Sequence, residues 1–289
     1  MDTDRFRVRP GQKIELRRHD PGDTAPFEHK RQAAGRLQKD LDRLVALQHK
    51  LYAQHRWSLL LIFQAMDAAG KDSAIAHVMS GLNPQGTDVH AFKRPSGEEL
   101  DHDYSWRTTK ALPERGRIGI FNRSYYEEVL VVRVHPEVLA NEKLPSSLVT
   151  RRIWRERYED INGFEQYLAR NGTVVRKFFL HVSKEEQRRR LLERLDDPAK
   201  NWKFDAADLS ERDRWDDYMR AYERALSKTS TRHAPWFIVP ADHKWFTRVV
   251  VAQLVIEALE SLDLKFPPLS KSHLDALAEA GARLEAEGA

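Results

Sequence analysis

The stretch that most constrains the fold of this chain is residues 59–73, LLLIFQAMDAAGKDS. Its first half is a continuous apolar run, which is typical of a strand covered on both faces of a parallel sheet. A turn of small residues follows, and an amphipathic run at residues 75–79 predicts a helix directly after it. Strand, tight turn, Lys71 and helix form the layout of a phosphate-binding P-loop, in which backbone N–H groups and a helix N-terminus surround anionic oxygens.

The stretch departs from the usual pattern G-x-x-x-x-G-K-[ST] at two places. Ala65 stands where the first glycine belongs, and Asp72 separates Lys71 from Ser73. The pattern alone therefore does not decide whether the turn binds phosphate. The candidate phosphate-binding residues of the turn are Ala68, Ala69, Gly70, Lys71, Asp72 and Ser73.

Asp67 is the one carboxylate inside the turn itself, before Gly70. A carboxylate repels phosphates unless a hard cation lies between them. We therefore expect Asp67 to be a ligand of Mg²⁺, with Mn²⁺ as the alternative ion. A turn residue or a helix cap is the other interpretation of this aspartate. We favour the metal, because a capping aspartate would lie nearer the start of the helix.

Five apolar runs that alternate with helical patterns predict an α/β fold with a doubly wound, five-stranded parallel sheet sandwiched by helices. The predicted strands are 59–63, 87–92, 117–122, 173–182 and 236–240, and the predicted helices are 28–54, 98–112, 147–169, 184–195, 210–227 and 246–262. Ligands of such sheets lie outside the carboxyl edge of the strands. That edge should gather the turn, residues 93–97, residues 122–126 and the loops after Val182 and Pro240.

The ends of the chain differ in composition from its middle. Residues 1–27 hold prolines and glycines among charges and predict an irregular arm, residues 28–266 form the main domain, and the Ala- and Glu-rich residues 267–289 predict a tail with a surface helix. There is no cysteine, which excludes disulfides, thiol catalysis and Cys-ligated zinc. No signal peptide and no apolar run approaching the roughly 18 residues of a membrane span is present, so a cytoplasmic protein without a membrane partner is expected.

Clustered cations surround the predicted cleft although the net charge is only +4, from 48 basic and 44 acidic residues. Residues 188–212 have the character of a lid, where Arg190 and Arg194 at i, i+4 share one helix face and could both swing onto a phosphate chain. A solvated helix face that pairs with neighbouring glutamates is the alternative. Further candidate phosphate ligands are Lys93, Arg94, Arg133, Lys200 and Lys203.

The end of the predicted strand 117–122 runs directly into Asn122 and Arg123. P-loop folds usually place an acidic, metal-holding residue at this position, and an asparagine shifts that task to Asp67. Arg123 should point into the same cleft. A helix cap is an equally good interpretation of Asn122 considered alone.

Several long motifs resemble the second family of polyphosphate kinases over about residues 30–265. These are QAMDAAGKDS (64–73), GLNPQG (81–86), AFKRPSGEELDHDYSWR (91–107), GRIGIFNRSYYEEVLVVRVHPE (116–137), DDPAKNWKF (196–204) and APW (234–236). The resemblance implies a thymidylate-kinase-like P-loop core with a helical lid. It implies an Mg²⁺-dependent enzyme that moves phosphoryl groups between inorganic polyphosphate and nucleotides and forms a homo-oligomer, dimeric or tetrameric.

The resemblance also assigns roles to individual residues. The implied catalytic residues are Asp67, Lys71, Asn122, Arg123 and Arg190, and the implied nucleotide-binding residues are Asn83, Gly86, Arg94, Asn122, Arg123, Glu128 and Arg133. Asn122 and Ala65, with the pair Glu127 and Glu128, look like the class that phosphorylates both nucleoside mono- and diphosphates, here AMP and ADP to give ADP and ATP.

Two other functions remain open from the sequence. An ATP-dependent nucleotide kinase would need a pocket for a donor base, on which the sequence is silent. A non-catalytic binder of RNA or another polyanion would explain the basic helix but not Asp67, which opposes an anion unless a metal is bound. We therefore expect the enzyme and no nucleic-acid partner.

Overall fold

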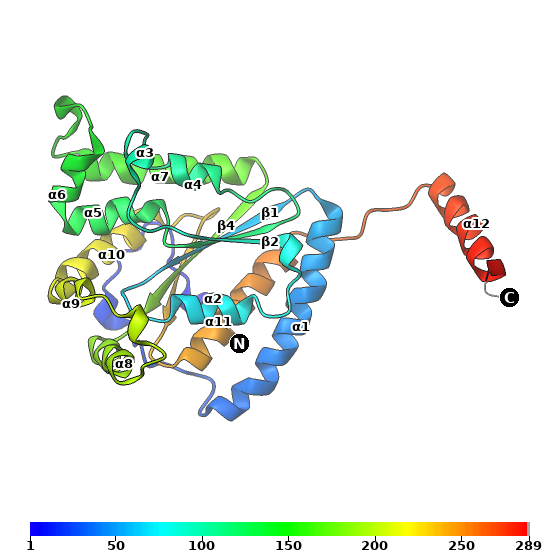
Figure 1. Ribbon diagram of the computed structural model, residues 1–289, viewed down its shortest axis with the longest axis horizontal. Helices are drawn as coiled ribbons and strands as arrows, with labels where there is room; N and C mark the ends of the chain where they lie inside the picture. The colour runs from blue at the N-terminus through cyan, green and yellow to red at the C-terminus, as the bar shows by residue number, and fades with distance from the viewer. Residues whose placement is uncertain (288–289) are drawn as a thin grey trace.

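A five-stranded sheet forms the centre of the computed structural model, which describes residues 1–287 (Figure 1). Its strands are β1 (Ser58–Gln64), β2 (Thr87–Ala91), β3 (Ile118–Asn122), β4 (Thr173–His181) and β5 (Trp236–Pro240). They lie in the order β2-β3-β1-β4-β5, and every neighbouring pair is parallel. All seven residues of β1 are buried, as its continuous apolar run predicts. The predicted α/β fold is confirmed.

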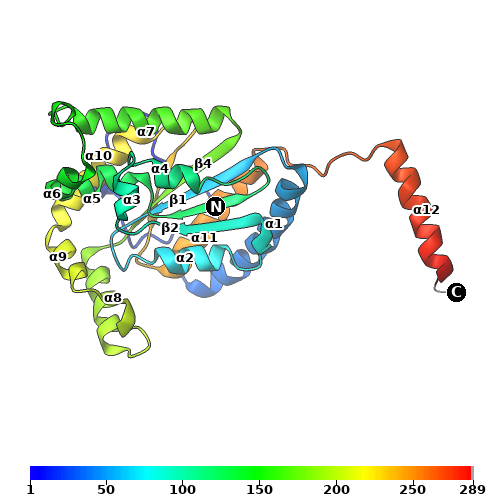
Figure 2. The same cartoon turned by 45° about the horizontal axis from the view of Figure 1, so that its top comes forward.

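Helices cover both faces of the sheet (Figures 1 and 2). On one face α11 (Lys244–Glu260) contacts the sheet, α1 (Lys30–Gln54) and α2 (Lys71–Val78). On the other face lie α7 (Ile153–Arg170) and α10 (Trp215–Thr229), which contact each other, with α5 (Val131–Val134) against α10. Because α11 lies between α1 and the sheet, most of its side chains are buried, which accounts for its nearly continuous apolar sequence.

The N-terminal arm is irregular apart from two short 3₁₀ helices, η1 (Asp4–Phe6) and η2 (Leu16–Arg18). It is nevertheless part of the domain, because Val8 N donates to Trp236 O at 2.9 Å and Arg7 forms an antiparallel bridge with Phe237 of the edge strand β5. The side chains of Phe6, Val8, Ile14 and Leu16 are buried in the common core.

Three predicted helices differ from the structure. The predicted helix 98–112 is two short helices, α3 (Gly97–Leu100) and α4 (Trp106–Lys110), because Asp103 turns the chain by accepting from Ser105 N at 2.9 Å. The predicted helix 210–227 is divided at Arg214 into α9 (Ala207–Asp213) and α10. The predicted helix 147–169 begins only at Ile153.

The remaining elements are short, except for α8 and the tail helix α12. They are η3 (Pro84–Gly86), η4 (Tyr125–Val129), α6 (Pro136–Leu139), η5 (Ala140–Glu142), η6 (Ser146–Leu148), α8 (Lys184–Asp196), η7 (Asn201–Lys203) and α12 (Lys271–Glu287). The tail helix α12 stands away from the domain in both views and exposes Leu274, Leu277 and Leu284 (Figures 1 and 2). Within residues 1–287 no helix has the length and apolar character needed to cross a bilayer.

Candidate active site

The turn between β1 and α2 lies at the carboxyl edge of the sheet, where the sequence predicts it. Gly70 is the residue before α2 and has a φ of +103°, a left-handed conformation that glycine adopts without a steric penalty. A Cβ there would lie 3.6 Å from the guanidinium Nη1 of Arg190, which is an ordinary contact, so the positive φ is what favours glycine. Ala68 has a positive φ of 59° as well. The turn therefore holds a conformation that its small residues make accessible.

Lys71 folds back over the turn. Its Nζ donates to the carbonyl oxygens of Ala65 at 2.8 Å and Met66 at 3.4 Å, and the residue is buried. Burial lowers the pKa of Lys71, while the nearby Asp67 carboxylate opposes that shift. A cation held by two neutral carbonyls has a strong electrostatic preference for an anionic partner, so a phosphate oxygen is the natural ligand for this ammonium.

Arg123 connects the end of β3 to the turn. Its backbone N donates to Phe63 O at 3.0 Å, and its guanidinium Nη2 lies 3.1 Å from Asp67 Oδ1. Nη1 lies 3.9 Å from an oxygen of Glu127. These two carboxylates, Glu127 first, raise the pKa of Arg123. Arg123 thus stands at the P-loop turn, as predicted from the strand end.

Glu127 is the site residue that sequence reasoning left without a role. Burial raises the pKa of this carboxyl group, and the nearby Arg123 and Lys71 oppose the shift. The sequence carried a signal for Glu127. It lies four residues after Arg123, which directly follows the strand that ends at Asn122.

Asn122 contacts the first turn of α2. Its side-chain N donates to Asp72 Oδ1 at 2.6 Å, so the amide fixes Asp72 beside the P-loop. The capping interpretation of Asn122 is wrong, because Ser124 caps η4 by accepting from Tyr126 N.

Arg190 and Arg194 of α8 do not act alike. Arg190 is buried, and its guanidinium donates to four carbonyl oxygens: Ala68 at 3.1 Å, Ala69 at 2.7 Å, Ala241 at 2.6 Å and Asp242 at 2.9 Å. The expectation that Arg190 swings onto a phosphate chain does not fit this arrangement, in which its guanidinium is bonded to carbonyl oxygens of the turn. Its catalytic role stays a prediction. Arg194 is only half-buried and pairs with Asp208 at 3.1 Å.

The other predicted cations are distributed around the carboxyl edge. Lys93 and Arg94 follow β2, and the Lys93 carbonyl accepts from Arg107 at 2.7 Å. Arg133 donates to the Tyr158 hydroxyl at 3.0 Å and lies over the Trp154 ring. Lys200 pairs with Asp197 at 2.8 Å, and Lys203 lies over the ring of the exposed Trp202, in the loop between α8 and α9.

Glu128, predicted to bind the nucleotide, forms an ion pair with Arg157 of α7 at 2.8 Å. Burial raises the pKa of this glutamate to about 8, against the opposing effect of Arg157. In this arrangement the side chain holds η4 against α7.

Asn83 and Gly86 lie far from the turn, which corrects the prediction that they bind the nucleotide. Both precede Thr87, the first residue of β2, and therefore lie at the amino edge of a parallel sheet, opposite the P-loop. Asn83 is bonded to Gln48 of α1 through its backbone N at 2.8 Å and its carbonyl at 2.9 Å. A Cβ at Gly86 would meet the same Gln48 side chain at 2.7 Å.

The sequence is similar to known proteins along most of its length. A sequence model described as Polyphosphate kinase 2 (PPK2) matches residues 28–267. The chain is 54% identical over 269 residues to the ADP-polyphosphate phosphotransferase of Rhodopseudomonas palustris, covering 92% of this chain and 93% of that protein. It is 46% identical to the AMP/ADP-polyphosphate phosphotransferase of Meiothermus ruber, covering 91% and 95%.

A solved structure is similar as well. The crystal structure of polyphosphate kinase 2 from Arthrobacter aurescens TC1 superposes with a TM-score of 0.85 at 41% sequence identity and covers 94% of this chain and 95% of that one. The agreement in sequence and in fold spans nearly the whole chain, including the P-loop turn and α8. The chain belongs to the polyphosphate kinase 2 family.

Proposed function

We propose that this protein transfers phosphoryl groups from inorganic polyphosphate to AMP and ADP, forming ADP and ATP. The observation that carries the proposal is the convergence of Lys71, Arg123 and Asp67 on one turn at the carboxyl edge of the sheet, in a chain of this family. The names of the two relatives, one for ADP and one for both AMP and ADP, support the two acceptors.

Phosphoryl transfer asks the protein mainly for positioning and for charge neutralisation. The amides of the turn and the Lys71 ammonium would hold the donor chain. The Arg123 guanidinium would contact the oxygens of the transferring phosphoryl group in the transition state. The attacking atom is an oxygen of the acceptor phosphate, which carries no proton that a strong base must remove. Because the equilibrium involves similar phosphoanhydride bonds on both sides, the same groups serve the reverse reaction.

Asp67 would hold Mg²⁺ together with the phosphates. Magnesium sites of kinases commonly use one or two carboxylates, water and substrate phosphate oxygens rather than a cage of protein ligands. The donor set fits this pattern: Asp67 is the carboxylate of the turn, and no group of three or more metal-ligating side chains occurs within residues 1–287. The bound ion would neutralise charge on the phosphoryl oxygens.

Replacement of Asp67 by Asn should raise the Mg²⁺ concentration needed for half-maximal activity by roughly tenfold or more, because a charged ligand is lost. The measurement is a Mg²⁺ titration of polyphosphate-dependent ATP formation after chelator treatment. Asp217→Asn, on α10, where the exposed carboxylate pairs with Arg220, is the matched control and should titrate like the unmodified protein. An unchanged Mg²⁺ requirement in Asp67→Asn would remove Asp67 from the metal site.

The function itself is tested by supplying AMP, polyphosphate and Mg²⁺ without ATP and measuring ATP with a luciferase assay. We expect ATP to accumulate, and we expect Lys71→Ala to lower the rate by roughly 10²–10³-fold because one donor to the phosphoryl oxygens is lost. Lys228→Ala, at the far end of α10, is the control. If no ATP forms although ATP plus AMP gives ADP, the protein is an ordinary nucleotide kinase. Binding of polyphosphate without turnover would favour a non-catalytic polyanion binder.

A further inference from the structure

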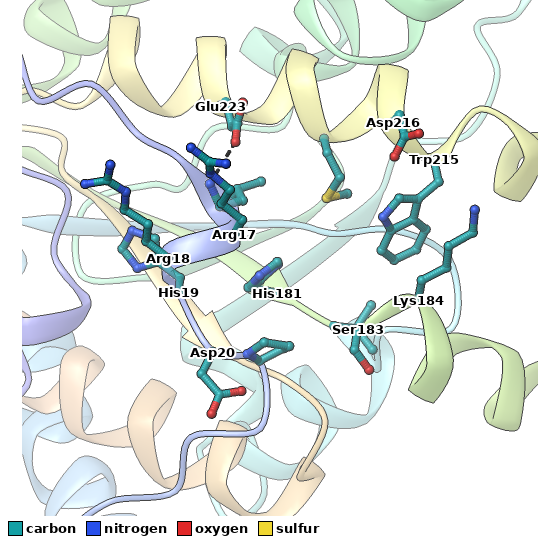
Figure 3. A pocket seen from close by; sticks show the side chains of 14 residues that line it. Arg17, Arg18, His19, Asp20, His181, Ser183, Lys184, Trp215, Asp216 and Glu223 are labelled. Carbon is teal, nitrogen blue, oxygen red and sulfur yellow. Dashed lines mark hydrogen bonds between the residues drawn. The ribbon is translucent and has the colours of Figure 1, made fainter.

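A cavity of about 630 Å³ opens beside the carboxyl end of β4 and contains no residue of the P-loop turn (Figure 3). One wall is the N-terminal arm, one is the start of α10 and one is the start of α8, and His181 lies at the centre of the view. The lining residues are Leu16, Arg17, Arg18, His19, Asp20, Pro21, His181, Val182, Ser183, Lys184, Trp215, Asp216, Met219 and Glu223. The arm wall precedes residue 28, where the family match begins.

The imidazole of His181 borders this cavity, and hydrogen bonds with the backbone of Leu16 and His19 act on it. Only 8% of the residue is exposed. Burial lowers the pKa of the ring to about 4, so the imidazole is neutral at neutral pH. A neutral imidazole brings no charge that would attract an anion, so His181 contributes mainly ring surface to the cavity.

The walls combine apolar surface with a mixed set of charges. Leu16, Pro21, Val182, Trp215 and Met219 form apolar surface large enough for a planar ring system. Three cations and three carboxylates, from Arg17, Arg18, Lys184, Asp20, Asp216 and Glu223, also line the cavity, which disfavours a ligand that is only a chain of phosphates.

Four of these six charged side chains already have partners, and one of the four is Asp20, whose carboxylate accepts from Gly22 N at 2.8 Å. Arg17 and Arg18 both pair with Glu15, at 3.1 and 3.0 Å, and Glu223 accepts from Leu16 N at 2.8 Å. The Lys184 ammonium, in contrast, enters no ion pair within residues 1–287. It is therefore the cation available to an anionic group of a ligand.

We propose that this cavity is a second binding site for a nucleoside monophosphate, separate from the P-loop, with the base between Trp215, Met219 and His181 and the phosphate near Lys184. The proposal does not rest on the proposed catalytic function, since it concerns binding without polyphosphate.

The cavity is joined to the P-loop turn through Asp242. Its carboxylate accepts from Ser183 N at 2.7 Å, and its backbone N donates to Pro21 O at 3.0 Å, so it fixes two lining residues. Its carbonyl accepts from Arg190, which holds Ala68 and Ala69 of the turn. A ligand in the cavity thus contacts segments that share a hydrogen-bond chain with the catalytic turn.

Methyl NMR of the intact chain tests the site directly. The chain has four methionines, and two of them report the two sites: Met219 lines the cavity and Met66 belongs to the P-loop turn. With ¹³C-methyl methionine, and Met219→Leu to assign its resonance, we expect AMP and adenosine each to shift the Met219 signal saturably. A Met219 signal unmoved by millimolar AMP overturns the proposal. Saturable shifts with inorganic tripolyphosphate but not with adenosine also overturn it, because the cavity would then be an anion site.

Two variants extend the test to the ligand's two halves. Lys184→Gln should weaken AMP binding about tenfold, because a charge-assisted hydrogen bond is lost, and should leave adenosine binding unchanged. Met219→Trp should fill the cavity and remove one equivalent of bound AMP in calorimetric titrations, provided that its melting temperature matches the parent. If Lys184→Gln weakens the binding of AMP and of adenosine equally, the placement of the phosphate is wrong. If Met219→Trp binds as many equivalents of AMP as the parent, the cavity is not a binding site.

Discussion

Arg123→Ala should lower the turnover number for polyphosphate-dependent ATP formation by roughly 10³-fold, the lower end of what the loss of a transition-state arginine costs in phosphoryl transfer. That factor corresponds to about 4 kcal/mol of transition-state stabilisation. The reason is geometric: the guanidinium lies 3.1 Å from Asp67 and beside Lys71, where negative charge would develop on the transferred group. Steady-state kinetics with AMP and polyphosphate, each varied in turn, measure it.

Two controls make the Arg123 result interpretable. Arg123→Lys keeps the charge but loses the planar fork, so it should recover only part of the rate. Arg188→Ala, an exposed arginine of α8 paired with Glu185, should remain within twofold of the parent. Because Glu127 loses its cationic neighbour in Arg123→Ala, melting temperatures must be compared as well. Turnover within tenfold of the parent in a folded Arg123→Ala would exclude Arg123 from the transition state.

Glu165→Ala should destabilise the domain by about 3–5 kcal/mol, because it leaves the buried ammonium of Lys177 without its counter-charge. Both side chains are fully buried, and Lys177 Nζ lies 2.6 Å from Glu165 Oε2. The second carboxylate oxygen accepts from the hydroxyls of Tyr125 at 2.9 Å and Tyr126 at 2.8 Å. Burial lowers the pKa of Lys177, and Glu165 opposes that shift. At roughly 2–4 °C per kcal/mol for a chain of this size, thermal unfolding should occur about 10 °C lower.

The network around Glu165 joins three elements, which is why its loss should be costly. Lys177 of β4 also donates to the Thr229 carbonyl at the end of α10, at 2.7 Å, while Glu165 belongs to α7. The double replacement Glu165→Leu with Lys177→Met should recover only part of the loss. It removes the unpaired buried charge, but the buried hydroxyls of Tyr125 and Tyr126 lose their acceptor. Glu159→Ala, on the exposed side of α7, should change stability by less than about 0.5 kcal/mol. A Glu165→Ala protein as stable as Glu159→Ala would contradict this reasoning.

The central features of the fold follow from local sequence. An apolar run buried on both faces, a small-residue turn and an amphipathic helix permit few arrangements, so β1, Gly70 and Lys71 are where the sequence places them. The rule that parallel sheets bind ligands at their carboxyl edge likewise brought Arg123 to the turn. The same rule excludes Asn83 and Gly86 from the site, because they precede β2 and lie at the amino edge of the sheet. Their assignment came from resemblance alone.

Other features depend on tertiary contacts that no local pattern records. The i, i+4 spacing of Arg190 and Arg194 indicates a shared helix face but not that one guanidinium is buried against four carbonyls while the other pairs with Asp208. The burial of Glu127 and the cavity around His181 likewise arise from segments distant in sequence. The break at Asp103 was missed because short-range turn geometry overrode a continuing apolar pattern. The break at Arg214 has no side-chain cap that the sequence could have signalled.

The four carbonyl bonds of Arg190 have a practical consequence for engineering the donor preference. They tie α8 to the loops after β1 and β5 at once, so a substitution of Arg190 changes the shape of the turn along with any contact to the donor. The loop at residues 197–206 carries Lys200, Lys203 and the exposed Trp202. The hydrogen bonds of Arg190 to the turn do not involve this loop. Libraries aimed at chain length or donor chemistry therefore belong in that loop, with Arg190 left constant.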